Sequence, residues 1–156
     1  MNTPIDVPAE LRRVLCAISD RREQAQAASE LICRLGGYRW AGIYDVEAEE
    51  IAVIGWSGPQ PPTFPRFPRS KGLNGAAVAS GQPVIAQDVS SDPRHLATIE
   101  GTRAEMIMPV LHADRVVGTI DVESANANAF GERDQRLLSE CAEALRQLWI
   151  RQSPVS

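Results

Sequence analysis

The chain of 156 residues has the size of one globular domain, with 44% hydrophobic and 23% charged residues, as in folded rather than disordered proteins. A chain of this length buries roughly two-thirds of the surface that its unfolded form exposes, so it needs no disulfide or metal ion to fold. The net charge of -4 argues against nucleic acid as a partner. We expect a single domain over residues 1–156.

The N-terminus and the apolar runs predict a cytoplasmic protein without a membrane partner. Residues 1–10 carry acids and prolines and lack the order of a signal peptide. The longest apolar stretches, such as residues 106–111, are far too short to span a bilayer. The odd number of widely spaced cysteines, Cys16, Cys33 and Cys141, indicates free thiols in a reducing compartment.

Apolar residues at helical spacing predict a helical segment over residues 8–35, ahead of a domain core at residues 37–149. The pair Gly36-Gly37 is a strong stop signal for that segment. The charged run at residues 20–23 interrupts its apolar stripe. The segment is therefore either two helices or one helix with a break.

Two strand pairs are predicted downstream. Residues 40–46 and 51–56 form the first hairpin around an acidic turn, and residues 105–111 and 116–122 form the second. A short strand is expected at residues 83–86. Two antiparallel hairpins with helices at both chain ends predict an α/β (α+β) fold, in which one face of an antiparallel sheet is covered by helices.

The remaining segments are loops and helices. Five prolines in residues 58–69 predict a loop, and residues 87–102 form a second long irregular stretch. A short helix is expected at residues 72–80 and a final helix at residues 132–149. Long loops between strands are usually functional or disordered, so both are candidates to cover a pocket on the open face of the sheet.

Four segments of this pattern resemble a GAF domain and, from Arg39 onward, the free methionine-R-sulfoxide reductases in particular. The resemblance covers about two-thirds of the chain. It implies a GAF-like central sheet with a pocket under the loops. The segments that carry it are Trp40–Tyr44, Lys71–Ala77, Asp88–Val89 with Pro93–Thr98, and Glu105–Pro109 with Val117–Ser124 and Phe130.

The same resemblance places the reductases' catalytic thiols at positions that carry no cysteine here. Those positions are Phe64, Asn74 and Thr98, which we expect to line the pocket as ligand-binding residues. A thiolate is nucleophilic and is regenerated by disulfide exchange, which phenyl and carboxamide groups are unable to do. The three cysteines of this chain lie in the predicted end helices. We therefore expect no reductase chemistry through the familiar thiols.

The reductases' substrate-holding carboxylates are matched by Glu105, Asp121 and Glu123. Asp121 and Glu123 are two residues apart on a predicted strand, so they share one face of the sheet. Three converging carboxylates favour a cation or an amine and raise each other's pKa values. The alternative is that some of the three face solvent.

Other candidate ligand contacts are aromatic or titratable. Trp40 and Tyr44 share strand parity, and we expect Tyr44 and Trp56 to be walls of the pocket, although strand aromatics are most often core. His95 lies in the second long loop, where it would reach a ligand, whereas His112 falls in a turn.

The spacing of histidines and cysteines predicts neither a metal ion nor a cofactor. Asn74 is a good N-cap residue for the short helix, which explains it without a ligand; the alternative is a ligand carboxylate or phosphate bound at that helix end. Gly72 and Gly75 at the start of that helix are not followed by a second phosphate-binding signature.

These features support three hypotheses. The first is a non-catalytic GAF-type sensor that binds a small polar metabolite and acts in signal transduction through partners or as a homodimer of terminal helices. The second is a divergent reductase that works through Cys16, Cys33 or Cys141. The third is a dimerisation module with a collapsed pocket, which Phe64 in place of a small thiol would help to fill.

Overall fold

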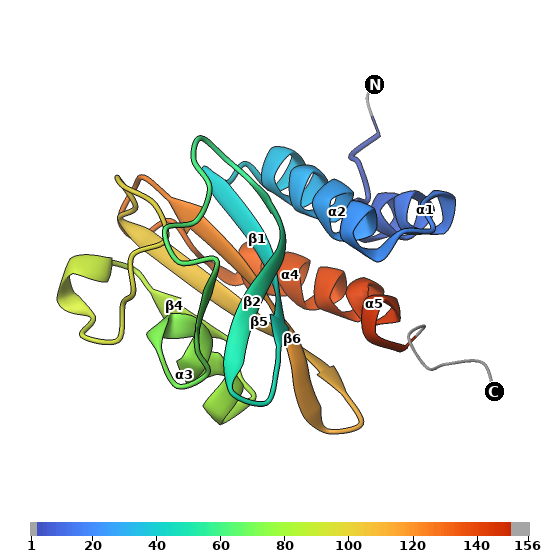
Figure 1. Cartoon of the computed structure of the whole chain (residues 1–156). Coiled ribbons are helices and arrows are strands. Elements are labelled where there is room, and N and C mark those ends of the chain that lie inside the picture. The colour runs from blue at the N-terminus through green and yellow to red at the C-terminus, as the bar shows by residue number, and fades with distance from the viewer. Residues whose placement is uncertain (1–2, 151–156) are drawn as a thin grey trace.

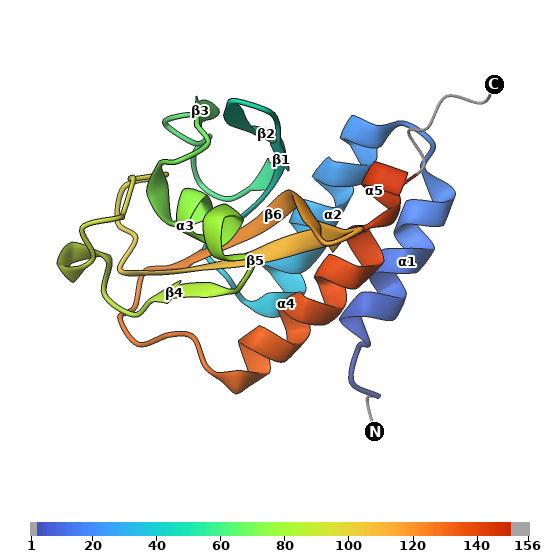
Figure 2. The same cartoon turned by 90° about the horizontal axis from the view of Figure 1, so that it is seen from below.

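The chain folds around one antiparallel sheet, seen edge-on between two layers in Figure 2. The computed structural model describes residues 3–150. Its six strands lie in the order β3-β2-β1-β6-β5-β4, so the two predicted hairpins meet at the β1–β6 pair. The strands are β1 (Trp40–Val46), β2 (Glu50–Ser57), β3 (Arg66–Pro68), β4 (Val84–Ala86), β5 (Ala104–His112) and β6 (Arg115–Ser124).

The helices divide between the two faces of the sheet. The N- and C-terminal helices cover one face, and α3 and the long loops lie over the other, as the sequence predicts (Figures 1 and 2). No helix within residues 3–150 is both long and apolar enough to cross a membrane. The helices are α1 (Val7–Ala17), α2 (Arg21–Gly36), α3 (Gly72–Ser80), α4 (Glu132–Leu145) and α5 (Gln147–Ile150), with a 3-10 turn, η1, at Val89–Ser91.

Alternation along the strands sorts the side chains between the two layers. On β6, Ile120 and Val122 join the core beneath the helices. Thr119, Asp121 and Glu123 are also fully buried, but they point to the opposite face, as period two requires. The middle of β6 is thus buried on both faces, apolar toward the helices and polar toward the loops.

The N-terminal helical segment is two helices. Asp20 lies between them and caps α2, because its carboxylate accepts a hydrogen bond of 3.0 Å from the backbone N–H of Glu23. At the other end Gly37 adopts a left-handed conformation (φ 75°) that favours glycine, which explains the stop signal. The charged run that interrupts the apolar stripe is therefore the start of the second helix.

The prediction of loop throughout residues 58–69 is wrong at its end. Residues Arg66–Pro68 form β3, which pairs with β2 and buries Phe67. The prolines conceal this strand, since proline is unfavourable inside a sheet. Pro68 is tolerated because β3 is an edge strand in the sheet order.

The predicted single helix at residues 132–149 is also wrong, because it breaks at Arg146 into α4 and α5. The indole N–H of Trp149 donates a hydrogen bond of 2.8 Å to Asp45 on β1. The guanidinium of Arg21 binds the same carboxylate at 2.6 Å and lies over the Trp149 ring. These contacts hold α5 against β1 and α2.

Candidate ligand-binding site

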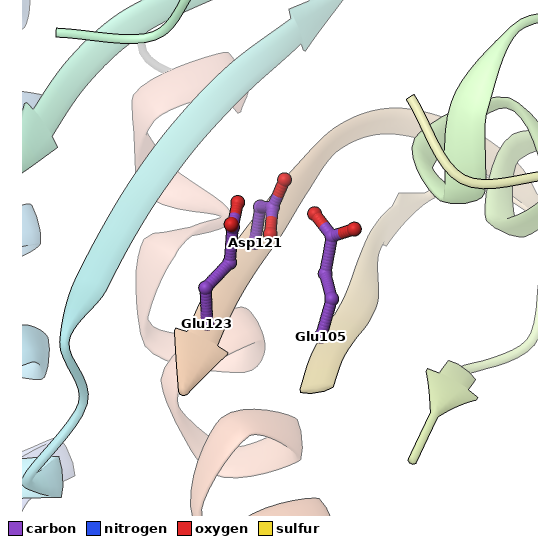
Figure 3. A group of neighbouring side chains, drawn as sticks. All are labelled: Glu105, Asp121 and Glu123. Carbon is purple, nitrogen blue, oxygen red and sulfur yellow. The ribbon is translucent and has the colours of Figure 1, made fainter. Parts of the chain in front are cut away.

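Three carboxylates meet on the loop-covered face of the sheet. Glu105 rises from β5, and Asp121 and Glu123 rise from the neighbouring strand β6 (Figure 3). Glu105 and Glu123 are directly opposite in the strand register. One oxygen from each of the three groups lies within 4.8 Å of the others, and the residues are 0–2% exposed. The sequence-based alternative that some of them face solvent is thereby excluded.

Neutral groups donate hydrogen bonds to two of these carboxylates, Asp121 and Glu123. The amide of Asn74 on α3 donates to Asp121 at 3.0 Å and accepts from the hydroxyl of Thr119 at 2.6 Å. Thr102 donates to Glu123 at 2.6 Å. One oxygen of each carboxylate, Glu105 Oε1, Asp121 Oδ1 and Glu123 Oε2, makes no hydrogen bond with the described residues.

Burial and mutual repulsion favour the protonated forms of Glu105 and Asp121. Desolvation first, and then the negative charge of Glu123, raises the pKa of Glu105 well above its usual range. Desolvation and the charge of Glu105 raise the pKa of Asp121 in the same way. A buried anionic cluster of this kind is costly unless protons or a cation neutralise it.

A small cavity opens beside Glu105. Its water-accessible volume is about 10 Å³, room for roughly one water molecule. The loop residues Leu96 and Ala97 close it, and Phe64 lies at its edge with 44% of its surface exposed. The full lining is Tyr44, Phe64, Phe67, Gly72, Leu73, Asn74, Leu96, Ala97, Thr98 and Glu105.

The structure brings most of the predicted site residues together. The three positions that the family resemblance aligns with thiols, Phe64, Asn74 and Thr98, all line the cavity, and so does Tyr44. His95 approaches from the loop, with Nδ1 3.3 Å from Glu105 Oε1. Trp56 is not among the lining residues; it packs in the neighbouring cluster around Trp40 and Tyr44.

The interpretation of Asn74 as a helix cap is wrong. The N-cap position of α3 is Lys71, and Asn74 lies inside the helix. Its side chain is 5% exposed and points at the carboxylates. Because asparagine favours N-cap positions, the sequence suggested a cap, whereas the Asn74 amide donates a hydrogen bond to Asp121 on β6.

Sequence reasoning missed several polar and apolar groups of the site. Thr119 and Thr102 hold Asn74 and Glu123, and Phe67 and Leu96 close the cavity. Thr119 has a usable signal, because it precedes Asp121 by two residues on the same strand. The other three are on loops or the hidden edge strand, where no periodicity applies.

The cysteines lie in the helical layer. Cys141 on α4 is buried in the core beneath the sheet, and Cys33 on α2 packs against that core. Cys16 is exposed on α1. All three are on the face opposite the carboxylates, and burial raises the pKa of Cys141 to about 12.

The carboxylates are also arranged as oxygen ligands for a cation. Carboxylate oxygens suit Mg²⁺, Ca²⁺ and Mn²⁺, and an ammonium group meets the same need for charge. The prediction that the chain binds no metal ion considered only histidine and cysteine ligands. It therefore does not apply to a site made of carboxylate oxygens alone. The geometry of the cluster therefore suits a cation, either an amine or a metal ion.

Comparison with known families places the site in context. The family model described as "GAF domain" matches residues 19–148. This chain belongs to the GAF domain family. The match includes α2, the whole sheet and α4, so the carboxylates and the loops over them are part of the GAF domain.

Individual relatives agree with this assignment. Over 123 residues the GAF domain is 29% identical to protein YtsP of Bacillus subtilis, with 79% of this chain and 76% of that protein covered. It is 25% identical to free methionine-R-sulfoxide reductase of Escherichia coli, with 80% and 74% covered. The structure of free methionine-R-sulfoxide reductase from Neisseria meningitidis in complex with its substrate is similar at 26% identity and a TM-score of 0.85, covering 93% of this chain and 87% of that one.

Proposed function

We propose that this GAF domain binds a small polar metabolite through an ammonium group and does not itself reduce methionine sulfoxide. The observation that carries the proposal is the buried set of Glu105, Asp121 and Glu123, each with one oxygen that makes no hydrogen bond within residues 3–150. An ammonium group has three donors and a positive charge, and so matches three acceptors in a low-dielectric site.

The relatives support an amine as the anchored group. Two of them are named for free methionine-R-sulfoxide, an amino acid with an unblocked ammonium group. The walls beside the carboxylates are mainly apolar or neutral, among them Tyr44, Phe67 and Leu73. Such a site accepts a compact ligand with one cationic end and a less polar remainder.

The positions of the thiols support binding without reduction. Sulfoxide reduction by cysteine requires a thiolate at the sulfur atom. Of the described residues that line the cavity, none is a cysteine. For Cys33 or Cys141 to act, it would have to cross the sheet from the helical layer.

Thermal unfolding with matched ligands tests the binding. We expect L-methionine and its R-sulfoxide to raise the melting temperature, because a ligand at 100 times its Kd adds about 2.7 kcal/mol of stability. Their N-acetyl forms, which lack the charge, should give no shift. Glu105→Gln should weaken the shift, whereas Glu140→Gln on the outer face of α4 should leave it unchanged.

Other outcomes of this experiment assign the site differently. A shift with MgCl₂, CaCl₂ or MnCl₂ and none with free amines would identify a metal site. Equal shifts for free and N-acetylated ligands would exclude the ammonium anchor. NADPH consumption with thioredoxin, thioredoxin reductase and methionine-R-sulfoxide, if abolished by Cys→Ser, would establish the divergent reductase.

The small cavity favours one rival function, an interaction module with a filled pocket. Space for roughly one water molecule does not admit a metabolite unless the cover moves. Under this rival a broad screen of amines and metal ions at millimolar concentration gives no shift, and carboxylate variants change only stability. Self-association by sedimentation would then be the activity to measure.

A further inference from the structure

His95 provides the nearest basic group to the buried carboxylates. Its Nδ1 lies 3.3 Å from Glu105 Oε1, although the geometry is not that of a hydrogen bond. Glu105 is 2% exposed and the His95 side chain 18% exposed. Among the described residues, no lysine or arginine forms an ion pair with the carboxylates.

The same histidine belongs to the segment that closes the cavity. We call residues 93–98 the cover segment; its Leu96, Ala97 and Thr98 all line the cavity. Its C-terminal end is fixed to the β2–β3 loop, because the N–H of Thr63 donates to the carbonyl of Thr98 at 2.8 Å and its hydroxyl donates at 2.9 Å. The cavity is thus closed by two loops that are hydrogen-bonded to each other, the cover segment and the β2–β3 loop.

Within the described residues, the hydrogen bonds of the N-terminal half of the cover segment are all local. The backbone N–H of His95 donates to the carbonyl of Asp92 at 3.1 Å, and Arg94 binds the Asp92 side chain. Within the described residues, the polar contact between positions 93–97 and the sheet is the one from His95 to Glu105. The imidazole therefore lies where an ion pair with Glu105 would connect the cover segment to the floor of the pocket.

We propose that His95 occupies Glu105 in the ligand-free protein and that the ammonium group of a ligand displaces it, releasing the cover segment. The inference rests on the proposed amine-binding function. Glu105 Oε1 makes no hydrogen bond with the described residues, and His95 Nδ1 lies 3.3 Å from it, so a ligand that takes this oxygen competes with the imidazole for the same position. Because the cavity holds about one water molecule, entry also requires Leu96 and its neighbours to move.

Displacement of His95 from Glu105 couples ligand binding to a change in the conformation of the cover segment. Two arrangements of the cover segment, one held by His95 and one free of it, differ in whether Glu105 is engaged by the protein or by the ligand. The apparent affinity for an amine is then reduced by the fraction of molecules in which His95 holds the cover closed. His95 thus positions the cover segment and competes with the ligand's ammonium group for Glu105.

The inference is tested by whether His95 variants bind a ligand more tightly or more weakly than the wild type. With L-methionine as the calorimetric probe, His95→Ala should bind about fivefold more tightly, the lower end of typical coupling between sites. His95→Lys places a permanent cation in the same position and should bind more weakly than the wild type. His112→Ala, at the end of β5, is the matched histidine control and should leave the Kd unchanged. Weaker or unchanged binding by His95→Ala would overturn the inference.

A ligand-free measurement separates this inference from the proposed function. Amide hydrogen exchange at Leu96, Ala97 and Thr98 should become several-fold faster in His95→Ala than in the wild type, with exchange on β1 unchanged. If the amides respond but no amine binds to any variant, the proposed function fails and the His95 contact stands. If amines bind and the amides do not respond, the inference fails alone.

Discussion

The buried carboxylates make the site a source of pH-dependent instability. Glu105 and Asp121 have pKa values raised above the ordinary 4.5 and 3.8, so between those values and the raised ones the folded state holds more protons than the unfolded state. The free energy of unfolding therefore falls as pH increases through this window. This is the reverse of the usual behaviour of an ion-paired carboxylate.

Urea unfolding between pH 5 and pH 8 measures this effect. Without ligand, stability should decrease with pH by at most about 1.4 kcal/mol per pH unit for each extra proton retained. Glu105→Gln removes one titrating group and should flatten the curve, making the variant more stable than the wild type at pH 8. Stability that increases with pH over this range would show that the carboxylates are ionised and compensated in the folded protein.

The residue types of the site were predictable, but their environment was not. Alternation on one strand is enough to place Asp121 beside Glu123, and the resemblance supplies Glu105 on the next strand. Nothing in the sequence shows that Asn74 reaches Asp121, because that contact depends on how α3 packs over the sheet. The approach of His95 to Glu105 also depends on the path of a loop.

At the scale of elements, the packing of α5 against the central strands is tight. Gly118 on β6 lies directly under Trp149, and a Cβ built there would be 2.2 Å from the indole ring and 2.8 Å from the carbonyl oxygen of Tyr44. The indole is also fixed by Asp45. Glycine is thus required at this position by close approach.

Gly118→Ala should consequently destabilise the domain. The ring must shift from its contacts with Asp45 and Arg21, and overpacking of this kind typically costs 1–3 kcal/mol. Denaturant unfolding monitored by tryptophan fluorescence measures the change. Gly131→Ala is the control, because a Cβ there meets nothing within 4 Å. Equal stabilities of the two variants would mean that α5 is only loosely attached.

The boundaries of helices and strands were predictable where capping residues and alternation indicate the same position. Their prediction failed where tertiary contacts determine the boundary. The hairpins follow from period-two patterns with short turns. Strand β3 was missed because its prolines signal a loop, and it exists only as an edge partner of β2. The break at Arg146 was missed because the apolar stripe continues through it.

At the scale of the whole molecule, the sheet separates the thiols from the buried carboxylates and the cavity beside them. We expect iodoacetamide to modify exposed Cys16 in the native protein and to modify buried Cys141 only after unfolding. Alkylation at Cys16 should leave the thermal shift with L-methionine intact, because α1 lies on the far face of the sheet. Peptide mapping by mass spectrometry identifies the modified thiols. Loss of the thermal shift after modification at Cys16 alone would show that the helical layer and the loop-covered face of the sheet are coupled.

The predicted homodimer of terminal helices remains a prediction. The apolar stripe that suggested it, Leu138, Cys141, Leu145 and Leu148, is 0–2% exposed within a single chain. The domain's own sheet and α1 therefore already cover this stripe. A dimer would have to use other surfaces of the helices.

The central pairing of β1 with β6 has a consequence for how the domain is made. Gly42, near the start of the sheet, lies opposite Asp121, near its end, so contacts between distant parts of the chain complete the pocket floor. Folding dominated by such pairings is slow compared with that of helical bundles, because loop closure must precede them. During synthesis the three carboxylates come together only after β6 has left the ribosome, so a truncated chain that ends before Asp121 lacks two of them, however well its first hairpin forms.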